Sequence, residues 1–214
     1  MILPPLYAII DFSYLAAKPD PISAAASYAE EMLSAGATLV QLRDKSEPAQ
    51  PRRFLSCARE LRRITMDHAT LIINDRIDIC LAADADGVHL GQDDLSPEAA
   101  RRIFASMKHG RSQIIGYSTH DLDQVRQAGK LPIDYIAIGP VFTTSSKANP
   151  DPVIGLEGVR QAREVTQKPL VAIGGITRQN CRQVTEAGAE SVAVISDLFE
   201  SPGKAVADFL RVLG

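Results

Sequence analysis

Acidic residues follow two apolar runs in the middle of the chain. Residues 71–73 lead toward Asp75, and residues 87–90 lead toward Asp93 and Asp94. If both runs are neighbouring parallel strands, their carboxyl ends place Asp75 and one of the later acids at one point of the sheet edge. Carboxylates gathered there are costly unless a cation or a substrate holds them. The pattern therefore indicates a site for Mg²⁺, with Asp75 and Asp94 as ligands and Asp93 as the less favoured candidate.

Helix capping is the competing explanation for these acids. Asp75 and Asp94 each precede a helical pattern, and an aspartate in that position commonly caps a helix. For a single aspartate, capping would be the better explanation. The metal site is favoured because both acids occur together with the basic residues described next.

Three polar residues alternate at the end of an earlier apolar run. Gln41, Arg43 and Lys45 would point to the same side of an extended segment, with Leu42 and Asp44 on the opposite side. Two cations and an amide that face one cavity suit an anionic, phosphorylated ligand. Taken alone, the Arg-Asp-Lys stretch is explained equally well by a surface turn.

Eight strand patterns alternate with eight helix patterns, and they must position these residues. The expected strands span residues 6–11, 38–42, 70–73, 87–90, 113–116, 135–138, 169–173 and 191–195. The expected helices span residues 22–35, 51–67, 77–83, 97–108, 121–128, 156–166, 178–187 and 202–213. The strand patterns are short and almost continuously apolar, as strands covered on both faces are.

A recurring helix ending favours a barrel over an open sheet. Gly36, Asp84, Gly129 and Gly188 each follow an alanine at the end of a helix pattern and lead into a strand. The repeat divides the chain into four β-α-β-α units. A doubly wound sheet also alternates strands and helices, but no G-x-G-x-x-G follows the first strand. We therefore predict one domain over residues 1–214, a single-domain α/β protein with the (β/α)₈ TIM barrel fold.

Two further segments would lie on the catalytic, carboxyl-terminal face of such a barrel. The polar loop 139–147 carries Thr144, Ser146 and Lys147 and would form a lid over phosphates. Gly174-Gly175 and Ile195-Ser196 follow the last two strands, which is the usual phosphate-binding position of these barrels. An ordinary tight turn would also explain the two glycines.

The histidines and the composition narrow the function further. His89 stands inside an apolar run and is expected to be a satisfied core residue, whereas His120 is close to the inferred site. The net charge is −3, and the chain has no Trp, five Tyr and six Phe, with no basic stripe, so we expect no nucleic-acid partner.

The cysteines and the apolar segments indicate the compartment. Cys57, Cys80 and Cys181 are too far apart for a C-x-x-C motif and are odd in number, which argues against disulfides and zinc. The apolar N-terminus is short and lacks a basic region, and no run approaches the roughly 20 residues that cross a bilayer. We expect a cytoplasmic protein with no membrane partner, and a homo-oligomer is compatible with the sequence.

The chain resembles the thiamine phosphate synthase family in seven motifs that span most of its length. They are QLRDK (41–45), INDR (73–76), DGVHLGQDD (86–94), GYSTH (116–120), GPVFTTSSK (139–147), IGGIT (173–177) and VISD (194–197). The resemblance implies a transferase of thiamine biosynthesis. It would condense 4-amino-2-methyl-5-hydroxymethylpyrimidine diphosphate with hydroxyethylthiazole phosphate, with Mg²⁺ required, and release thiamine phosphate and pyrophosphate.

The resemblance also implies a role for each matching residue, with Asp75 and Asp94 as the Mg²⁺ ligands. The pyrimidine diphosphate would be held by Gln41, Arg43, Lys45, Asn74, Ser118 and Lys147. The thiazole phosphate would be held by Thr144, Ser146 and the backbone at Gly175, Ile195 and Ser196. The residues expected to take part in catalysis are Arg43, Lys45, Ser118 and Lys147. Two positions depart from the pattern: Arg76 stands where many members have an acid, and Ser146 where many have Thr.

The expected mechanism follows from charge. Mg²⁺ and the lysines and arginine would stabilise departing pyrophosphate, and the aminopyrimidine would stabilise the exocyclic cation that the thiazole nitrogen then captures. No protein nucleophile is needed, and no Ser-His-Asp or Cys-His motif is apparent. The alternatives are a thiazole tautomerase on the same barrel, a non-catalytic sensor of phosphorylated ligands, and a generic phosphate-binding isomerase. They are disfavoured by the paired acids, by the complete basic set, and by the lack of a Glu/His acid–base pair.

Overall fold

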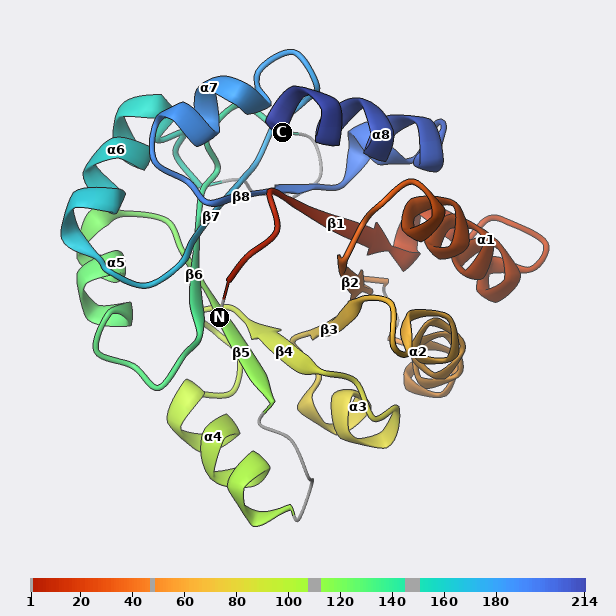
Figure 1. Cartoon of the computed structure of the whole chain (residues 1–214). Helices are drawn as coiled ribbons and strands as arrows, with labels where there is room; N and C mark the ends of the chain where they lie inside the picture. The colour runs from red at the N-terminus through yellow and green to blue at the C-terminus, as the bar shows by residue number, and fades with distance from the viewer. Residues whose placement is uncertain (1, 47–48, 108–112, 145–150) are drawn as a thin grey trace.

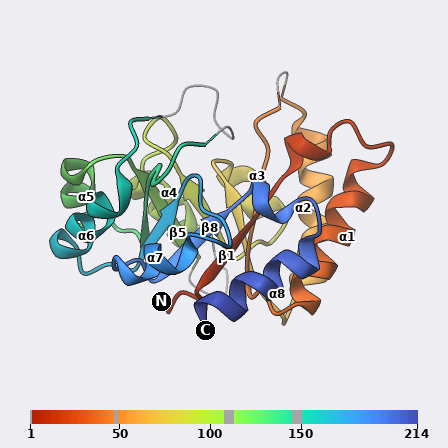
Figure 2. The ribbon, with the colours of Figure 1, turned by 90° about the horizontal axis from the view of Figure 1, so that it is seen from above.

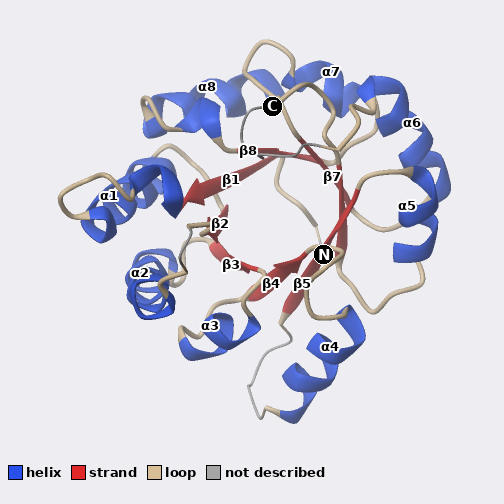
Figure 3. Ribbon diagram, turned by 180° about the vertical axis from the view of Figure 1, so that it is seen from behind, coloured by secondary structure: helices blue, strands red, loops and turns tan. Residues whose placement is uncertain are grey.

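Eight parallel strands close into a barrel with helices around it (Figures 1 and 3). The computed structural model describes residues 2–46, 49–107, 113–144 and 151–214. Each strand pairs with the next one in the chain, and β8 pairs with β1, so the predicted (β/α)₈ barrel is confirmed. The strands are β1 (Leu6–Asp11), β2 (Leu39–Arg43), β3 (Thr70–Asn74), β4 (Gly87–Leu90), β5 (Ile114–Thr119), β6 (Tyr135–Ile138), β7 (Leu170–Ile173) and β8 (Ser191–Val194).

The helices form the outer layer, and the chain ends lie on the same side of the barrel (Figure 2). They are α1 (Pro21–Ser34), α2 (Pro51–Thr65), α3 (Ile77–Ala82), α4 (Pro97–Ser106), α5 (Leu122–Ala128), α6 (Gly155–Val165), α7 (Cys181–Glu186) and α8 (Pro202–Leu213), with short 3-10 helices η1 (Phe12–Leu15) and η2 (Ser196–Leu198). Among the described residues, no helix is long and apolar enough to cross a membrane.

Several bounds differ from the sequence-based expectation by one to three residues, and two differences add structure that was not predicted. β5 continues to Thr119, beyond the predicted end at residue 116, because Ser118 and Thr119 still pair with β6. The Thr119 hydroxyl donates to the carbonyl of Ala137 at 2.9 Å, so this polar residue is satisfied inside the sheet. The predicted loop at residues 12–21 contains η1, whose first turn is capped by the side chain of Asp11.

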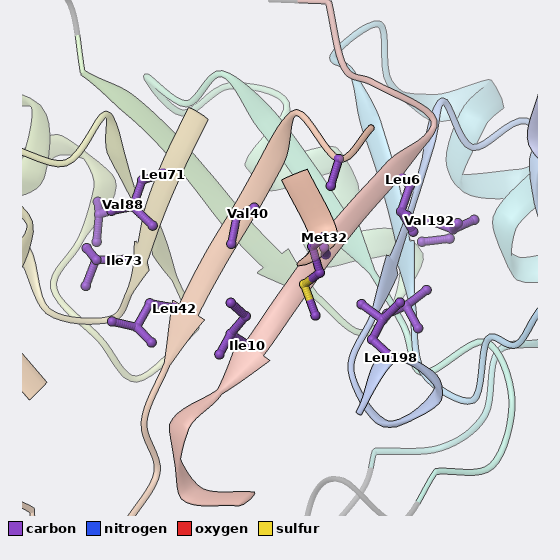
Figure 4. Packing of buried hydrophobic residues seen from close by; sticks show 14 of the residues in the cluster. Leu6, Ile10, Met32, Val40, Leu42, Leu71, Ile73, Val88, Val192 and Leu198 are labelled. Atoms are coloured by element: carbon purple, nitrogen blue, oxygen red, sulfur yellow. The ribbon is translucent and has the colours of Figure 1, made fainter. Parts of the chain in front are cut away.

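Side chains on alternate positions of the strands enter two separate apolar cores. The larger core lies between the barrel and the helices, and Figure 4 shows part of it, with Met32 of α1, Leu198 of η2 and residues of β1, β2, β3, β4 and β8 labelled. The smaller core fills the barrel and consists of Leu3, Tyr7, Ile9, Leu39, Ile72, Tyr135, Ala137, Val171 and Ala193. Because both faces of every strand are covered, the strands had to be almost continuously apolar.

Three acidic residues, Asp86, Asp134 and Glu190, stand immediately before β4, β6 and β8. Each accepts a hydrogen bond from a backbone N–H of the preceding strand, at 2.8, 2.7 and 2.7 Å (from Leu71, Ile115 and Leu170). Each also pairs with an arginine of α2, α4 or α6, at 3.1, 2.8 and 2.6 Å (Arg62, Arg101 and Arg163). The same contact therefore joins helix layer and barrel in three of the four repeats.

The helix endings of the repeat also recur, with one exception. Gly36, Asp84 and Gly188 have positive φ values of 103°, 54° and 112° and turn the chain from a helix into the next strand. Gly129 ends α5 with a φ of −54°, so its turn is right-handed. The left-handed turn suits glycine, and aspartate is among the few other residues that adopt it.

Candidate active site

The carboxyl ends of β2, β3 and β4 bring the predicted residues to one edge of the barrel. Asn74 ends β3 beside His89 of β4, and Gln41 of β2 lies beside Ile72 of β3. Gln41 and Asn74 are both buried. Leu42 belongs to the larger core between the barrel and the helices, so Gln41 and Leu42 point to opposite sides of β2, as predicted.

Asp75 and Asp94 lie together, as the strand order predicted. Burial and the neighbouring carboxyl of Asp75, which is within hydrogen-bonding reach, raise the pKa of Asp94 above its usual range. The backbone N–H of Gly91 donates to Asp94 Oδ2 at 2.7 Å and fixes this carboxylate. Lys45 Nζ lies 2.6 Å from Asp75 Oδ2 and supplies a counter-charge. Asp93 is exposed, which agrees with its lower rank as a ligand.

The acid pair fits a hard divalent cation that takes its other ligands from a substrate. Two crowded carboxylates, one with a raised pKa, are an arrangement that a cation would stabilise. Within the described residues, no group of three or more His, Cys, Asp or Glu side chains could hold a metal by itself. Mg²⁺ usually binds through one or two carboxylates and substrate phosphates, so a pair of carboxylates is compatible with a site of this kind.

Arg43 is anchored by an acid that the sequence reasoning missed. Its guanidinium Nη1 donates to Oδ2 of Asp11, the last residue of β1, and the two residues are register partners across β1 and β2. Asp11 is completely buried, and Oδ1 of the same carboxylate accepts the backbone N–H of Ser13 at 3.1 Å. The sequence did contain a signal for Asp11, because this acid ends the first strand pattern and almost all of the strand patterns are followed by candidate site residues.

Five polar side chains form an unbroken hydrogen-bonded chain across the barrel. Gln41 Nε2 donates to the Tyr7 hydroxyl at 2.8 Å, which lies 2.9 Å from the Tyr135 hydroxyl. The Tyr135 hydroxyl lies 2.9 Å from His89 Nδ1, and His89 Nε2 lies 2.8 Å from Ser118 Oγ. The prediction that His89 is a satisfied core residue is therefore correct, although its partners could not be read from the sequence.

Ser118 and His89 are in contact, a pair that the sequence reasoning did not predict. The third member is the hydroxyl of Tyr135, where a catalytic triad would have a carboxylate. Burial lowers the pKa of His89 to about 4, so its ring is a weak base at neutral pH. The pair therefore lacks the base that would activate Ser118 as a nucleophile.

The loops after β6 and β7 are packed directly against each other. The backbone N–H groups of Val141 and Phe142 donate to the carbonyls of Ile173 and Gly174, both at 2.9 Å. At Gly175, with a φ of 64°, a Cβ atom would lie 2.5 Å from the carbonyl oxygen of Thr143. Glycine is required here by both the backbone conformation and the close approach. The described part of the loop ends at residue 144, so Ser146 and Lys147 lie outside the described residues.

The remaining predicted phosphate-binding residues stand at the ends of neighbouring strands. Ile195 packs against the smaller core inside the barrel. Ser196 is the first residue of η2 and is exposed. The loops after β7 and β8 are joined by Arg178, whose Nε donates to Asp197 Oδ2 at 3.0 Å. The structure thus places Ile195 and Ser196 directly after β8, which ends one residue earlier than expected, and their contact with a phosphate stays a prediction.

Two other residues singled out in the sequence have structural partners. His120 Nδ1 lies 2.8 Å from the carbonyl oxygen of Gly139 and 3.4 Å from Asp151 Oδ2, so it holds the segment after β6. Arg76 pairs with Asp78 at the start of α3.

A parallel eight-stranded barrel with charged residues gathered at the carboxyl ends of its strands is the arrangement of (β/α)₈-barrel enzymes. Residues 13–198 match the family model described as thiamine monophosphate synthase. The chain belongs to this family, so the resemblance in the seven motifs is confirmed.

Individual relatives agree with the family model over most of the chain. A thiamine-phosphate synthase of Koribacter versatilis is 49% identical over 211 residues, which cover 99% of this chain and 96% of the relative. One of Methanospirillum hungatei is 44% identical over 180 residues, which cover 84% of each chain. The solved structure of a thiamine phosphate pyrophosphorylase from Pyrococcus furiosus is 34% identical, with a TM-score of 0.82 over 98% of this chain and 95% of that chain.

Proposed function

We propose that this chain condenses 4-amino-2-methyl-5-hydroxymethylpyrimidine diphosphate with hydroxyethylthiazole phosphate, to give thiamine phosphate and pyrophosphate. Membership of the thiamine monophosphate synthase family supports this reaction. The structural observation that carries the proposal is the acid pair of Asp75 and Asp94 with Lys45 held against it. A diphosphate with a bound divalent cation needs carboxylates and cationic groups at one place, and this edge of the barrel has both.

In the proposed reaction, the bond between the exocyclic carbon of the pyrimidine and the diphosphate oxygen breaks, and both electrons leave with the oxygen. The thiazole nitrogen then donates its lone pair to that carbon and forms the new C–N bond. No proton has to be moved to or from the reacting atoms in these two steps. The residues of the chain therefore have to bind, orient and neutralise charge.

Arg43 and Lys45 would stabilise the departing pyrophosphate together with Lys147. Among the described residues, Asp11 is the one hydrogen-bond partner of the Arg43 guanidinium, so further N–H donors of that group could face an anion. Lys45 is half-exposed and pairs with Asp75, so it can transfer its contact to a diphosphate oxygen. A Mg²⁺ ion held by Asp75 and Asp94 would supply further positive charge to the diphosphate.

Covalent catalysis by the protein is disfavoured because neither the Cys57 thiol nor the Ser118 hydroxyl is activated as a nucleophile. Burial raises the pKa of the Cys57 thiol to about 12, so that sulfur is protonated at neutral pH. The imidazole beside Ser118 is a weak base because of the low pKa of His89. Both findings support a step in which the substrate itself stabilises the developing cation.

One experiment tests the proposed function. The purified protein is incubated with both heterocyclic phosphates, with Mg²⁺ or with EDTA, and pyrophosphate and thiamine phosphate are measured. We expect stoichiometric formation of both products with Mg²⁺ and loss of both with EDTA. Asp94→Asn should lose turnover, whereas Asp93→Asn is the matched control because Asp93 is exposed and Asp94 is partly buried.

Three results would contradict the proposal. Isomerisation of the thiazole without pyrophosphate release would identify a tautomerase instead. Binding of the phosphorylated ligands without turnover, and independent of Mg²⁺, would identify a sensor. Full turnover of Asp94→Asn would remove that residue from the metal site.

We further propose the cytoplasm as the compartment of this enzyme. Cys57 and Cys181 are buried and form no disulfide bond, which supports a reducing environment. A homo-oligomer stays a prediction that the size of the particle in solution would test.

A further inference from the structure

The hydrogen-bonded chain across the barrel joins two residues that the proposed function assigns to the pyrimidine substrate. Gln41 stands at one end and Ser118 at the other, and Tyr7, Tyr135 and His89 connect them at 2.8–2.9 Å. Tyr7 and Tyr135 are almost completely inaccessible to solvent, and His89 is 8% exposed. The space for Tyr135 depends on Gly116, where a Cβ atom would lie 2.0 Å from the tyrosine ring.

One direction of this hydrogen-bonded chain uses the proton of every group within it. The Nε2 amide of Gln41 can only donate, so the Tyr7 oxygen accepts, and the direction that also uses the Tyr7 proton has Tyr7 donating to Tyr135. Tyr135 then has its own proton left to donate to His89 Nδ1. In a neutral imidazole one nitrogen accepts and the other donates, so Nε2–H donates to the oxygen of Ser118.

At the end of the hydrogen-bonded chain, Ser118 already accepts a hydrogen bond from His89 and keeps its own hydroxyl proton. That proton is available for an oxygen or nitrogen acceptor of a ligand in the mouth of the barrel. A chain that ran the other way would direct the Ser118 proton toward His89 and present only lone pairs to the ligand, which an anionic diphosphate would repel.

We propose that Tyr7, Tyr135 and His89 are positioning residues that hold Ser118 as a hydrogen-bond donor to the diphosphate-bearing substrate. They act through Ser118 and do not touch the reacting atoms. The inference rests on the proposed function for the identity of the ligand. The tautomer of His89 that it requires can be measured without any substrate.

The first test is ¹⁵N nuclear magnetic resonance of the histidine rings in the unmodified protein. We expect His89 to be protonated at Nε2 and unprotonated at Nδ1 at neutral pH. His89→Gln identifies the signal by its disappearance, because three other histidines are present in the chain. A ring protonated at Nδ1, or at both nitrogens, would overturn the proposal.

The second test is a double-mutant cycle between Tyr135 and Ser118. Tyr135→Phe should lower kcat/KM for the pyrimidine diphosphate about tenfold, which corresponds to one lost hydrogen bond. Ser118→Ala should lower it at least as much. If Tyr135 acts only through Ser118, the double variant is no worse than Ser118→Ala alone. Effects that multiply in the double variant would show that Tyr135 has a merely structural role and would overturn the proposal.

Two further variants control this cycle. Tyr28→Phe removes a hydroxyl from α1, where the ring packs against Phe199, and should leave kcat/KM unchanged. Tyr7→Phe leaves the contact between Tyr135 and His89 intact, so it should lower kcat/KM less than Tyr135→Phe does. A larger loss of kcat/KM in Tyr7→Phe than in Tyr135→Phe would contradict the proposed direction of the hydrogen bonds. If Tyr135→Phe does not fold, the tautomer measurement on the unmodified protein decides.

The outcomes separate this inference from the proposed function. An unmodified protein that releases no pyrophosphate contradicts the proposed function, whichever tautomer His89 adopts. A protein that releases pyrophosphate but has His89 protonated at Nδ1 keeps the proposed function and loses this inference.

Discussion

At the scale of single residues, Asp75 has a backbone conformation that few residues other than glycine adopt. Its φ is 61°, its N–H donates to the carbonyl of His89 at 2.7 Å, and the N–H of Arg76 returns to the carbonyl of Asn74 at 2.7 Å. The chain therefore turns sharply after β3, and the carboxylate is brought to Lys45. Such conformations cost about 1–3 kcal/mol and are common at functional sites.

Asp75→Asn should separate the charge of this residue from its backbone role. Asparagine tolerates the left-handed conformation, and it removes the repulsion with Asp94, so the melting temperature should stay within a few degrees of the original. The proposed metal site loses a ligand, so pyrophosphate release should fall by a factor on the order of 100 or more. Thermal unfolding and a pyrophosphate assay measure the two effects. An unfolded variant, or one with full turnover, would contradict this separation.

Lys147→Ala should lower turnover by a factor on the order of 100, because one cation that faces the departing pyrophosphate is lost. Lys147 lies outside the described residues, so this expectation rests on the 139–147 motif. Lys130→Ala is the control, since Lys130 is exposed just beyond α5. Equal turnover of the two variants would remove Lys147 from the mechanism.

At the scale of the elements, the acidic residues before β4, β6 and β8 each connect two neighbouring strands and a helix. Asp134 accepts the N–H of Ile115 at 2.7 Å and pairs with Arg101 at 2.8 Å, so one carboxylate contacts β5, β6 and α4. Asp86 and Glu190 do the same one repeat earlier and one repeat later. These contacts lie at the amino ends of the strands, away from the candidate site. In barrels of this type, residues on that face contribute to stability.

Asp134→Ala should lower the free energy of unfolding by about 1–3 kcal/mol, because the backbone N–H of Ile115 loses its partner. Turnover at a temperature where the variant is folded should stay unchanged. Asp123→Ala is the matched control, since Asp123 forms an exposed pair with Arg126 one turn away, and such pairs contribute about 0–1 kcal/mol. Denaturant unfolding measures both variants. Equal losses would show that the contact to the strand contributes nothing beyond a surface pair.

At the scale of the whole molecule, the centre of the barrel makes stability depend on pH. His89 is packed among Tyr7, Tyr135 and Ser118, with Asp94 nearby, and its folded pKa is about 4 against an ordinary value of 6.5. Between these two values the unfolded chain binds a proton that the folded protein does not. Stability therefore increases with pH through this window, and it is fully present above about pH 6.5.

Lowering the pH from 7 to 4 should cost the folded state on the order of 3 kcal/mol through His89 alone. Denaturant unfolding at several pH values measures the slope. His89→Gln removes the titrating group, so its stability should depend less on pH in this window. An equal slope in both proteins would show that His89 does not titrate as its burial implies.

The order of the elements and the residues at the strand ends could be predicted from the sequence alone. The bounds of β1, β4, β6 and α8 match the expected ranges, because apolar periodicity and helix caps are local properties of the chain. The proximity of Asp75 and Asp94 could also be predicted, because it follows from the pairing of two successive parallel strands. Family membership followed from motifs that are themselves local.

Contacts across the barrel were decided only by the tertiary structure. Asp11 under Arg43, and His89 between Tyr135 and Ser118, join residues that are 29 to 46 positions apart in the chain. Which of these groups meet depends on how the closed barrel fills its interior, and a hydrogen bond requires a separation of about 3 Å that no sequence spacing encodes. The sequence determined which chemical groups reach the carboxyl ends of the strands. The closure of the barrel decided which of them meet, because most buried polar groups in a folded protein have a hydrogen-bond partner.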